Sequence, residues 1–302
     1  MTKNHNSGAS STGDRALVLG GGGSAGNAWL IGVVAGLLEA DLDVTGADLI
    51  IGTSAGSTAA AQITGANPTE LFSDILATIS PPRTASAESV GGRIPMRPLN
   101  NLMETTSAII AAAGNAADMR RKMGAWALGT AAASDSSRWR ATVAARLPSQ
   151  NWPSRHLLIT AVDADTGDPV VFDRRSGVNL VDAVAASCAG GFAYSIAERK
   201  YIDGGYRTNA DNADLAAGYA RVLVLSPLGG RSRLPEDWGM HLSSQLAELR
   251  ANGSRVETIF PDSDSRNAFG SNMMDPSTRP PSARAGYNQG KAVAEQLTEF
   301  WR

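Results

Sequence analysis

The stretch that decides the fold is Asp48-Leu-Ile-Ile-Gly-Thr-Ser-Ala-Gly-Ser-Thr-Ala-Ala-Ala-Gln-Ile63. Its apolar start, residues 48–51, predicts a buried strand, and its alanine-rich end, residues 58–63, predicts a helix. Between them lies Gly52-Thr53-Ser54-Ala55-Gly56, a G-x-S-x-G pentapeptide that in this context is typical of a nucleophile elbow. Ser54 would then stand at a helix N-terminus, where free N–H groups stabilise developing negative charge. The plainer interpretation is a glycine-flanked turn with an N-cap serine.

Upstream, another strand-to-helix junction carries a run of glycines. Residues 16–19 predict a buried strand, Gly20 to Gly23 and Gly26 follow it, and residues 27–40 predict a buried helix. Strand, helix, strand and helix in succession predict parallel pairing with right-handed crossovers. A glycine run of this kind can point several N–H groups at one place, which beside Ser54 would make an oxyanion hole.

The glycine run has a second interpretation, because Gly21, Gly23 and Gly26 satisfy the G-x-G-x-x-G fingerprint of dinucleotide-binding folds. That fingerprint requires an acidic residue at the end of the second strand, where this chain has the pentapeptide around Ser54. No G-K-[ST] follows the run, which excludes a Walker A phosphate loop. A non-catalytic module that binds a nucleotide or an acyl ligand stays open as an alternative.

A serine nucleophile needs a base, and two candidates follow it in the sequence. Asp203 ends a predicted strand and precedes Gly204 and Gly205, so it would sit on a tight turn and point into a cleft. In a Ser54–Asp203 dyad the carboxylate would take the serine proton directly, and partial burial would raise its pKa. The alternative is a Ser–His–Asp esterase that uses His241, the one histidine after Asp203.

The rest of the chain predicts an α/β protein with one helical insertion. Residues 80–154 begin with a loop rich in proline and glycine and continue with weak helical patterns, which predicts a helical insertion or lid. Residues 1–14 are polar and predict a disordered tail before a single domain over residues 15–302. Further strands are predicted at 157–162, 170–172 and 221–226, and further helices at 180–187, 243–251 and 285–302.

Composition limits the class of protein. The chain has 302 residues, 43% hydrophobic and 19% charged, as expected of a globular protein, and its net charge of −2 gives no basic footprint for nucleic acid. The single cysteine, Cys188, excludes an internal disulfide and is expected to be a small buried residue, and the three histidines lack metal-site spacing. Residues 16–38 are uncharged but contain four consecutive glycines, so we expect neither a membrane span nor a signal peptide. A cytoplasmic location is the resulting expectation.

Together, the three motifs resemble those of the patatin-like phospholipase family. Residues 21–26 resemble its glycine-rich oxyanion loop, Gly52-Thr-Ser-Ala-Gly56 its nucleophile elbow, and Asp203-Gly-Gly205 the aspartate of its catalytic dyad. The resemblance covers residues 15–228. Supporting similarity lies in residues 158–167 (its central strand and turn), residues 183–188 (the helix before the aspartate) and Asn209, where the family commonly has asparagine.

This resemblance implies a three-layer α/β/α sandwich around a mainly parallel central sheet. It makes Ser54 the nucleophile and Asp203 the base of a lipid acyl hydrolase, with acyl transfer to another alcohol as a variant of the same chemistry. No metal or organic cofactor is implied. The remaining residues that the resemblance assigns are the oxyanion-hole donors Gly21, Gly22, Gly23 and Ala55 and the motif glycines Gly26, Gly52, Gly56, Gly204 and Gly205.

Two positions depart from the family pattern. Ala25 stands where the glycine loop often carries Lys or Arg, so we expect no positive charge beside the loop. Residues 189–192, Ala-Gly-Gly-Phe, stand where the family tends to have proline, which predicts a different cleft wall. Residues 229–302 are expected to pack on the domain as a C-terminal extension. The expected partner is a lipid or other acyl ester, with peripheral contact at a membrane left open and no oligomeric state predicted.

Overall fold

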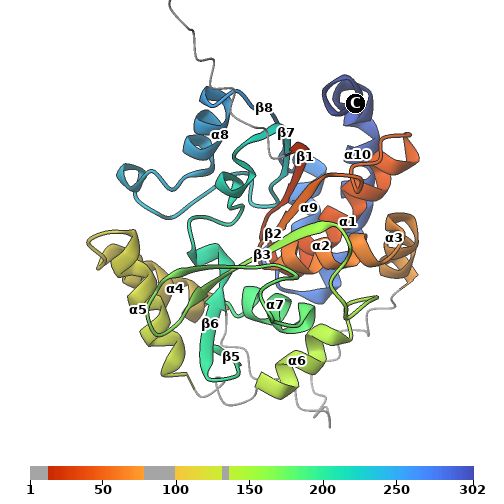
Figure 1. The fold of residues 1–302 in the computed structure, drawn as a ribbon. Helices are drawn as coiled ribbons and strands as arrows, with labels where there is room; N and C mark the ends of the chain where they lie inside the picture. Colours follow the sequence, from red (N-terminus) through yellow and green to blue (C-terminus); the bar gives the residue numbers. More distant parts are fainter. Residues whose placement is uncertain (1–12, 78–98, 131–135) are drawn as a thin grey trace, which may run out of the picture.

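A computed structural model describes residues 13–77, 99–130 and 136–302 of the chain. In this described part, the strands form one eight-stranded sheet with helices on both of its faces (Figure 1). The order along the sheet is β5-β6-β3-β2-β1-β7-β8, and β4 pairs with β3 beside this path. The strands are β1 (Gly13–Leu19), β2 (Leu49–Gly52), β3 (His156–Asp163), β4 (Pro169–Phe172), β5 (Tyr194–Ile196), β6 (Arg199–Asp203), β7 (Tyr219–Leu225) and β8 (Arg255–Ile259).

Most of the sheet is parallel. β3, β2, β1, β7 and β8 pair in parallel, whereas β4 and β6 are antiparallel to β3 and β5 is antiparallel to β6. The central parallel strands are apolar runs because helices cover both of their faces. β8 was not predicted, because its sequence Arg-Val-Glu-Thr-Ile lies at the sheet edge and lacks the continuous apolar run of the central strands. The predicted α/β fold around a mainly parallel sheet is confirmed.

Ten α-helices and four short 3-10 helices are found in the described ranges. The α-helices are α1 (Gly23–Glu39), α2 (Ala55–Gly65), α3 (Pro68–Ala77), α4 (Leu99–Ala111), α5 (Ala116–Leu128), α6 (Ser136–Ala144), α7 (Leu180–Ser187), α8 (Leu242–Ala251), α9 (Ser263–Phe269) and α10 (Arg279–Trp301). The 3-10 helices are η2 (Gly204–Tyr206), η3 (Ala213–Ala216), η4 (Glu236–Trp238) and η5 (Pro276–Thr278).

The two faces of the sheet carry separate apolar cores, because alternate residues of a strand point to opposite faces. Leu17 and Leu19 of β1 belong to the larger core, which includes residues of α1, α2, α7 and α10. Ala16 and Val18 of β1 belong to a smaller core with residues of η3 and α8. A third cluster joins α4 and α5 to the ends of β3 and β6, with Met123 fully buried in it. These layers make the predicted three-layer sandwich.

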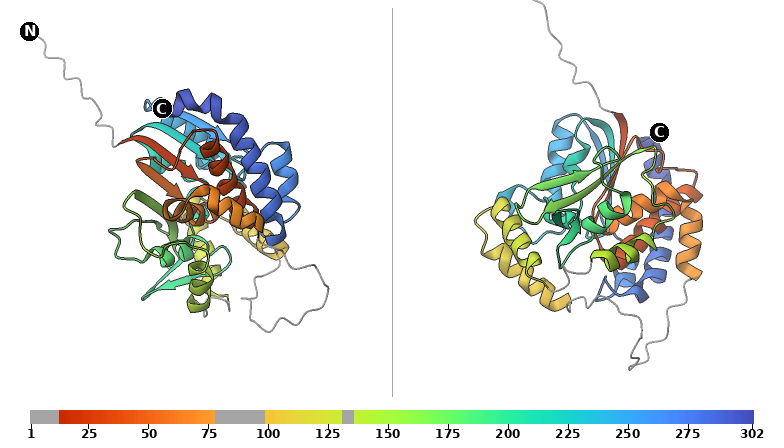
Figure 2. Two further views of the ribbon diagram at one scale, coloured as in Figure 1. Left: turned by 90° about the vertical axis from the view of Figure 1, so that its right-hand side faces the viewer. Right: turned by 60° about the horizontal axis from the view of Figure 1, so that its bottom comes forward.

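The helices α1 and α10 lie side by side on the larger core (Figures 1 and 2). A Cβ atom added to Gly32 would lie 2.1 Å from the carbonyl oxygen of Ala283, and one added to Gly36 would lie 2.1 Å from that of Tyr287. Only glycine therefore allows the two backbones to touch along this line. The indole N–H of Trp29 also donates to Oε1 of Gln289 at 3.1 Å, which fastens α1 to α10.

Two boundaries differ from the sequence-based expectations. β1 includes Gly13 and Asp14, which the sequence assigns to the tail. They extend the strand because Asp14 forms an ion pair with Arg221 of β7 and donates its N–H to Oδ2 of Asp48 at 3.0 Å. The rest of the predicted tail, residues 1–12, and residues 80–98 and 131–135 of the predicted insertion lie outside the described residues. No helix in the described ranges combines the length and the apolar character needed to cross a membrane.

Candidate active site

Ser54 lies between the end of β2 and the first turn of α2, in the elbow that the sequence predicts. Its φ of 53° places it in the left-handed region, which residues with side chains rarely adopt. The buried hydroxyl of Ser187, at the end of α7, accepts a hydrogen bond from the Ser54 N–H at 2.9 Å. The strained backbone is thus fixed by a neighbouring helix, and the half-buried Ser54 side chain faces away from α2 toward β6.

The glycines on either side of Ser54 are required by close backbone contacts. A Cβ atom added to Gly56 would lie 1.9 Å from the carbonyl oxygen of Leu19 in β1. One added to Gly52 would lie 2.6 Å from the Cα atom of Ser57 in the same turn. Both distances are well below van der Waals contact, so a larger side chain at either glycine would displace the elbow from the sheet.

Asp203 ends β6 and faces Ser54. Its Oδ2 accepts a hydrogen bond from Ser54 Oγ at 2.7 Å, while its Oδ1 accepts one from the Gly205 N–H at 2.8 Å. Burial raises the pKa of Asp203 to about 6, although both hydrogen bonds act in the opposite direction. The carboxylate is therefore fixed through one oxygen and free to act as a base through the other.

The glycine loop lies next to Ser54, but its N–H groups are not equivalent. The Gly21 N–H donates to the carbonyl oxygen of Ala210 at 2.7 Å. This N–H is therefore already occupied, contrary to the prediction that Gly21 is an oxyanion-hole donor. The N–H groups of Gly22, Gly23 and Ala55 donate to no acceptor among the described residues, because they precede or begin helices α1 and α2. These three donors are available to an anion at the two helix N-termini.

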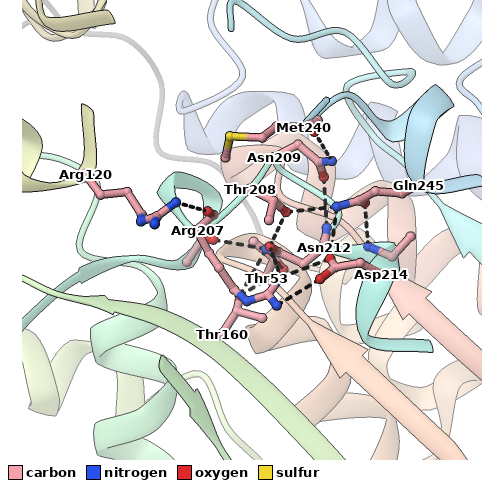
Figure 3. A network of polar contacts seen from close by, with 12 residues as sticks. Thr53, Arg120, Thr160, Arg207, Thr208, Asn209, Asn212, Asp214, Met240 and Gln245 are labelled. Carbon is pink, nitrogen blue, oxygen red and sulfur yellow. Dashed lines mark hydrogen bonds and ion pairs between the residues drawn. The ribbon is translucent and has the colours of Figure 1, made fainter. Parts of the chain in front are cut away.

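A polar network behind the dyad involves residues that the sequence reasoning missed (Figure 3). The side-chain amide of Asn212 donates to Oγ1 of Thr53 and to the carbonyl oxygen of Gly204, both at 3.0 Å. Thr53 also accepts a hydrogen bond from Thr160 of β3 at 3.0 Å. Since Thr53 precedes Ser54 and Gly204 follows Asp203, one buried amide connects the two halves of the site. The sequence offered one signal for this network, since Thr160 is a polar residue within the apolar run of β3.

Asn209, which the family resemblance singles out, organises the loop after Asp203 without touching Ser54. Its Oδ1 accepts the N–H groups of Asp211 and Asn212, and its amide donates to the carbonyl oxygen of Met240 at 2.7 Å (Figure 3). Asp211 is buried beside the glycine loop, and burial raises its pKa to about 7. This loop therefore contacts the glycine run directly, since Ala210 accepts the Gly21 N–H and Asp211 lies beside Gly20.

The side chains of Cys188 and His241 both contact backbone carbonyl oxygens, as is typical of structural residues. The half-buried Cys188 thiol contacts the carbonyl oxygen of Ser54 at 3.1 Å, and burial raises its pKa to about 11, so it stays protonated. The ring Nε2 of His241 contacts the carbonyl oxygen of Leu234 at 2.7 Å. Among the described residues, the hydroxyl of Ser54 meets Asp203 and not His241.

The glycine loop has a positive charge beside it, contrary to the expectation drawn from Ala25. Arg279, the first residue of α10, donates through Nη1 to the carbonyl oxygen of Ser24 at 3.3 Å and to Oδ1 of Asn27 at 2.9 Å. The guanidinium therefore reaches the first turn of α1 from a helix that is distant in the sequence. A pattern confined to residues 20–26 could not show this contact.

Comparisons with known proteins identify the family of the chain. A family model described as patatin-like phospholipase matches residues 17–216, which is more than half of the chain. Among solved structures, VipD from Legionella pneumophila is 13% identical with a TM-score of 0.43, over 95% of this chain and 67% of VipD. The type III effector protein ExoU is 16% identical with a TM-score of 0.38, over 93% of this chain and 53% of ExoU. No curated protein matches the sequence. On the family match, the chain belongs to the patatin-like phospholipase family.

Proposed function

We propose that the protein hydrolyses carboxylic esters of lipids, with Ser54 as the nucleophile and Asp203 as the general base. Membership of the patatin-like phospholipase family supports a lipid acyl hydrolase. The observation that carries the finer assignment is the 2.7 Å hydrogen bond from Ser54 Oγ to Asp203 Oδ2. A carboxyl with a pKa of about 6 is ionised at neutral pH and still basic enough to accept the serine proton.

In the first half of the reaction, Ser54 Oγ attacks the ester carbonyl carbon while its proton moves to Asp203 Oδ2. The carbonyl oxygen becomes an oxyanion, and the unpaired N–H groups of Gly22, Gly23 and Ala55 would stabilise it. When the tetrahedral intermediate collapses, the bond to the alcohol breaks and Asp203 returns the proton to the leaving oxygen. An acyl-enzyme on Ser54 remains.

In the second half, water attacks the acyl carbon and gives its proton to Asp203. Collapse of the second tetrahedral intermediate breaks the bond to Ser54 Oγ, which takes the proton back as the carboxylic acid leaves. An acceptor alcohol in place of water would give acyl transfer by the same steps. The aspartate alternates between base and acid without a histidine, because it contacts the serine directly.

A fluorophosphonate probe tests this assignment, because it forms a stable adduct with an activated serine. Wild-type protein, Ser54→Ala, Asp203→Asn and His241→Ala would be labelled, and the adduct located by mass spectrometry. We expect an adduct on Ser54 that is absent in Ser54→Ala, strongly reduced in Asp203→Asn and unchanged in His241→Ala.

The His241→Ala variant separates the dyad from the Ser–His–Asp alternative. Loss of labelling in folded His241→Ala would favour that alternative. Absence of any adduct on folded wild-type protein, with and without added lipid or detergent, would instead favour the non-catalytic ligand-binding module. After labelling, a panel of lipid esters that differ in headgroup and chain length would identify the substrate.

A further inference from the structure

Two arginines near the glycine loop have no carboxylate partner among the described residues. Arg279 uses only Nη1 for its hydrogen bonds to Ser24 and Asn27, which leaves the donors on Nε and Nη2 unused in this part of the chain. Burial, and then the charge of Arg146, lower the pKa of Arg279, with no acidic group acting in the opposite direction. A partly buried guanidinium without a counterion is costly unless an anion binds beside it.

Arg146 is the second member of this pair. It follows α6, and its guanidinium stacks on the ring of Trp139 with 5.5 Å from its central carbon to the ring centroid. Trp139 is itself fixed by a hydrogen bond of 2.9 Å from its indole N–H to the carbonyl oxygen of Ala185. Stacking occupies the face of the guanidinium and leaves the N–H groups at its edge to bind an acceptor.

Two buried amides join the arginines into one structure. Oδ1 of Asn27 accepts the hydrogen bond from Arg279, and its Nδ2 donates to Oε1 of Gln62 at 3.0 Å. The amide nitrogen of Gln62 then donates to the carbonyl oxygen of Arg146 at 3.0 Å. Both amides are buried, so the chain of contacts from α10 through α1 and α2 to the segment after α6 is fixed.

Arg279 is connected to the glycine loop and to the elbow. Arg279 contacts Ser24, which directly follows the oxyanion donor Gly23. Asn27, which holds Arg279, also donates to the carbonyl oxygen of Ala55 at 3.4 Å, in the first turn after Ser54. Arg146 is close enough to lower the pKa of Cys188, whose thiol contacts Ser54.

We propose that Arg279 and Arg146 form a phosphate-binding site that holds the headgroup phosphate of a phospholipid while its ester lies at Ser54. Two guanidinium groups whose charges act on each other suit a tetrahedral anion with several acceptor oxygens better than they suit an uncharged ester. This inference rests on the proposed hydrolase function for its role in substrate choice. The binding site itself is independent of turnover.

Binding can be measured without catalysis in the Ser54→Ala protein. Isothermal titration calorimetry at low salt would use inorganic phosphate and sn-glycerol 3-phosphate as probes. We expect saturable binding that is weakened by about tenfold or more in Arg279→Gln and in Arg146→Gln. Arg279→Lys should keep part of the affinity, since it retains the charge and loses the fork. The matched control is Arg174→Gln, an exposed arginine in the loop after β4, which should bind as Ser54→Ala alone does.

The source of the phosphate is tested by turnover in otherwise wild-type protein. The ratio of kcat/KM for phosphatidylglycerol to that for diacylglycerol, both in mixed micelles, should fall about tenfold in Arg279→Gln and Arg146→Gln but not in Arg174→Gln. Phosphate binding without any change in this ratio would support the site and assign it to a soluble anion.

The outcomes also separate this inference from the proposed function. Phosphate binding that depends on both arginines, in a protein that hydrolyses no ester, would support the site and contradict the hydrolase. Ester hydrolysis in a protein that binds neither probe would overturn the site and leave the hydrolase standing, as would equal binding by the arginine variants and the control. Arg146 is exposed, so its variant keeps the test valid if Arg279→Gln fails to fold.

Discussion

The nucleophile elbow and the α1–α10 contact both depend on two glycines four residues apart. In the elbow, Gly52 and Gly56 let the chain turn tightly against β1, and the strain between them presents a hydroxyl to Asp203. In α1, Gly32 and Gly36 have ordinary helical surroundings and let the backbone of α10 approach. The same spacing therefore supports a strained turn at the proposed nucleophile in one region and helix packing in the other, and the neighbouring strand or helix decides which.

If this contrast is right, removing the reactive groups of the elbow should abolish activity and leave the fold intact. We expect Ser54→Ala and Asp203→Asn each to lower kcat/KM for a lipid ester by about a thousandfold or more, because each removes a group from the reacting pair. Thermal unfolding followed by circular dichroism should show a Tm close to that of wild type. Retention of most of the activity in either variant would contradict the dyad.

The opposite result is expected in the helix pair. Gly32→Ala should lower the free energy of unfolding by about 1–3 kcal/mol, because its Cβ atom would overlap the Ala283 carbonyl and force α10 away. Urea unfolding measures this loss, and kcat of the folded protein should change little. The control is Gly46→Ala, where an added Cβ atom meets nothing within 4 Å. Equal stability of the two variants would contradict backbone contact between α1 and α10.

The elbow should also respond to pH in a way that the helix pair does not. The proposed base, Asp203, would act in its ionised form, and burial raises its pKa to about 6. Below that value, kcat/KM should fall about tenfold per pH unit as the carboxylate becomes protonated, and above it the rate should level off. A pH–rate profile on an uncharged ester measures this. A midpoint near the ordinary aspartate pKa would show that burial does not tune the base. Gly32→Ala should leave the midpoint unchanged.

The smallest effect is expected at Ser187, a positioning residue. Ser187→Ala removes the acceptor of the Ser54 N–H, so the strained elbow should sample other conformations. We expect kcat to fall about fivefold, the equivalent of one ordinary hydrogen bond, with little change in KM. Steady-state kinetics separates the two constants, and Ser187→Thr should restore part of kcat. A change in KM alone would indicate a role in binding instead.

The sequence predicts what depends on neighbours along the chain. β1, α1, β2 and α2 follow from apolar runs interrupted by glycine, and the order of the three motifs predicts which residues meet in the candidate site. Contacts between segments that lie far apart in the sequence could not be predicted in this way. The hydroxyl of Ser187 and the amide of Asn212 meet the elbow only because α7 and the loop after β6 pack there, and Arg279 reaches Ser24 across 255 positions. β8 was missed because the charged residues Arg255 and Glu257 interrupt the apolar run that marks the other parallel strands.

The packing of α1 against α10 has a consequence for how the chain folds. Trp29 and Gln289 are 260 positions apart, so α1 cannot be covered until most of the chain has been synthesised. Until then, α1 exposes an apolar surface on nearly every side, since most of its residues are buried in the native fold. Closing so long a loop is entropically slow, and we expect a late folding step that depends on chaperones. We therefore expect the glycine contact between α1 and α10 to form late in folding.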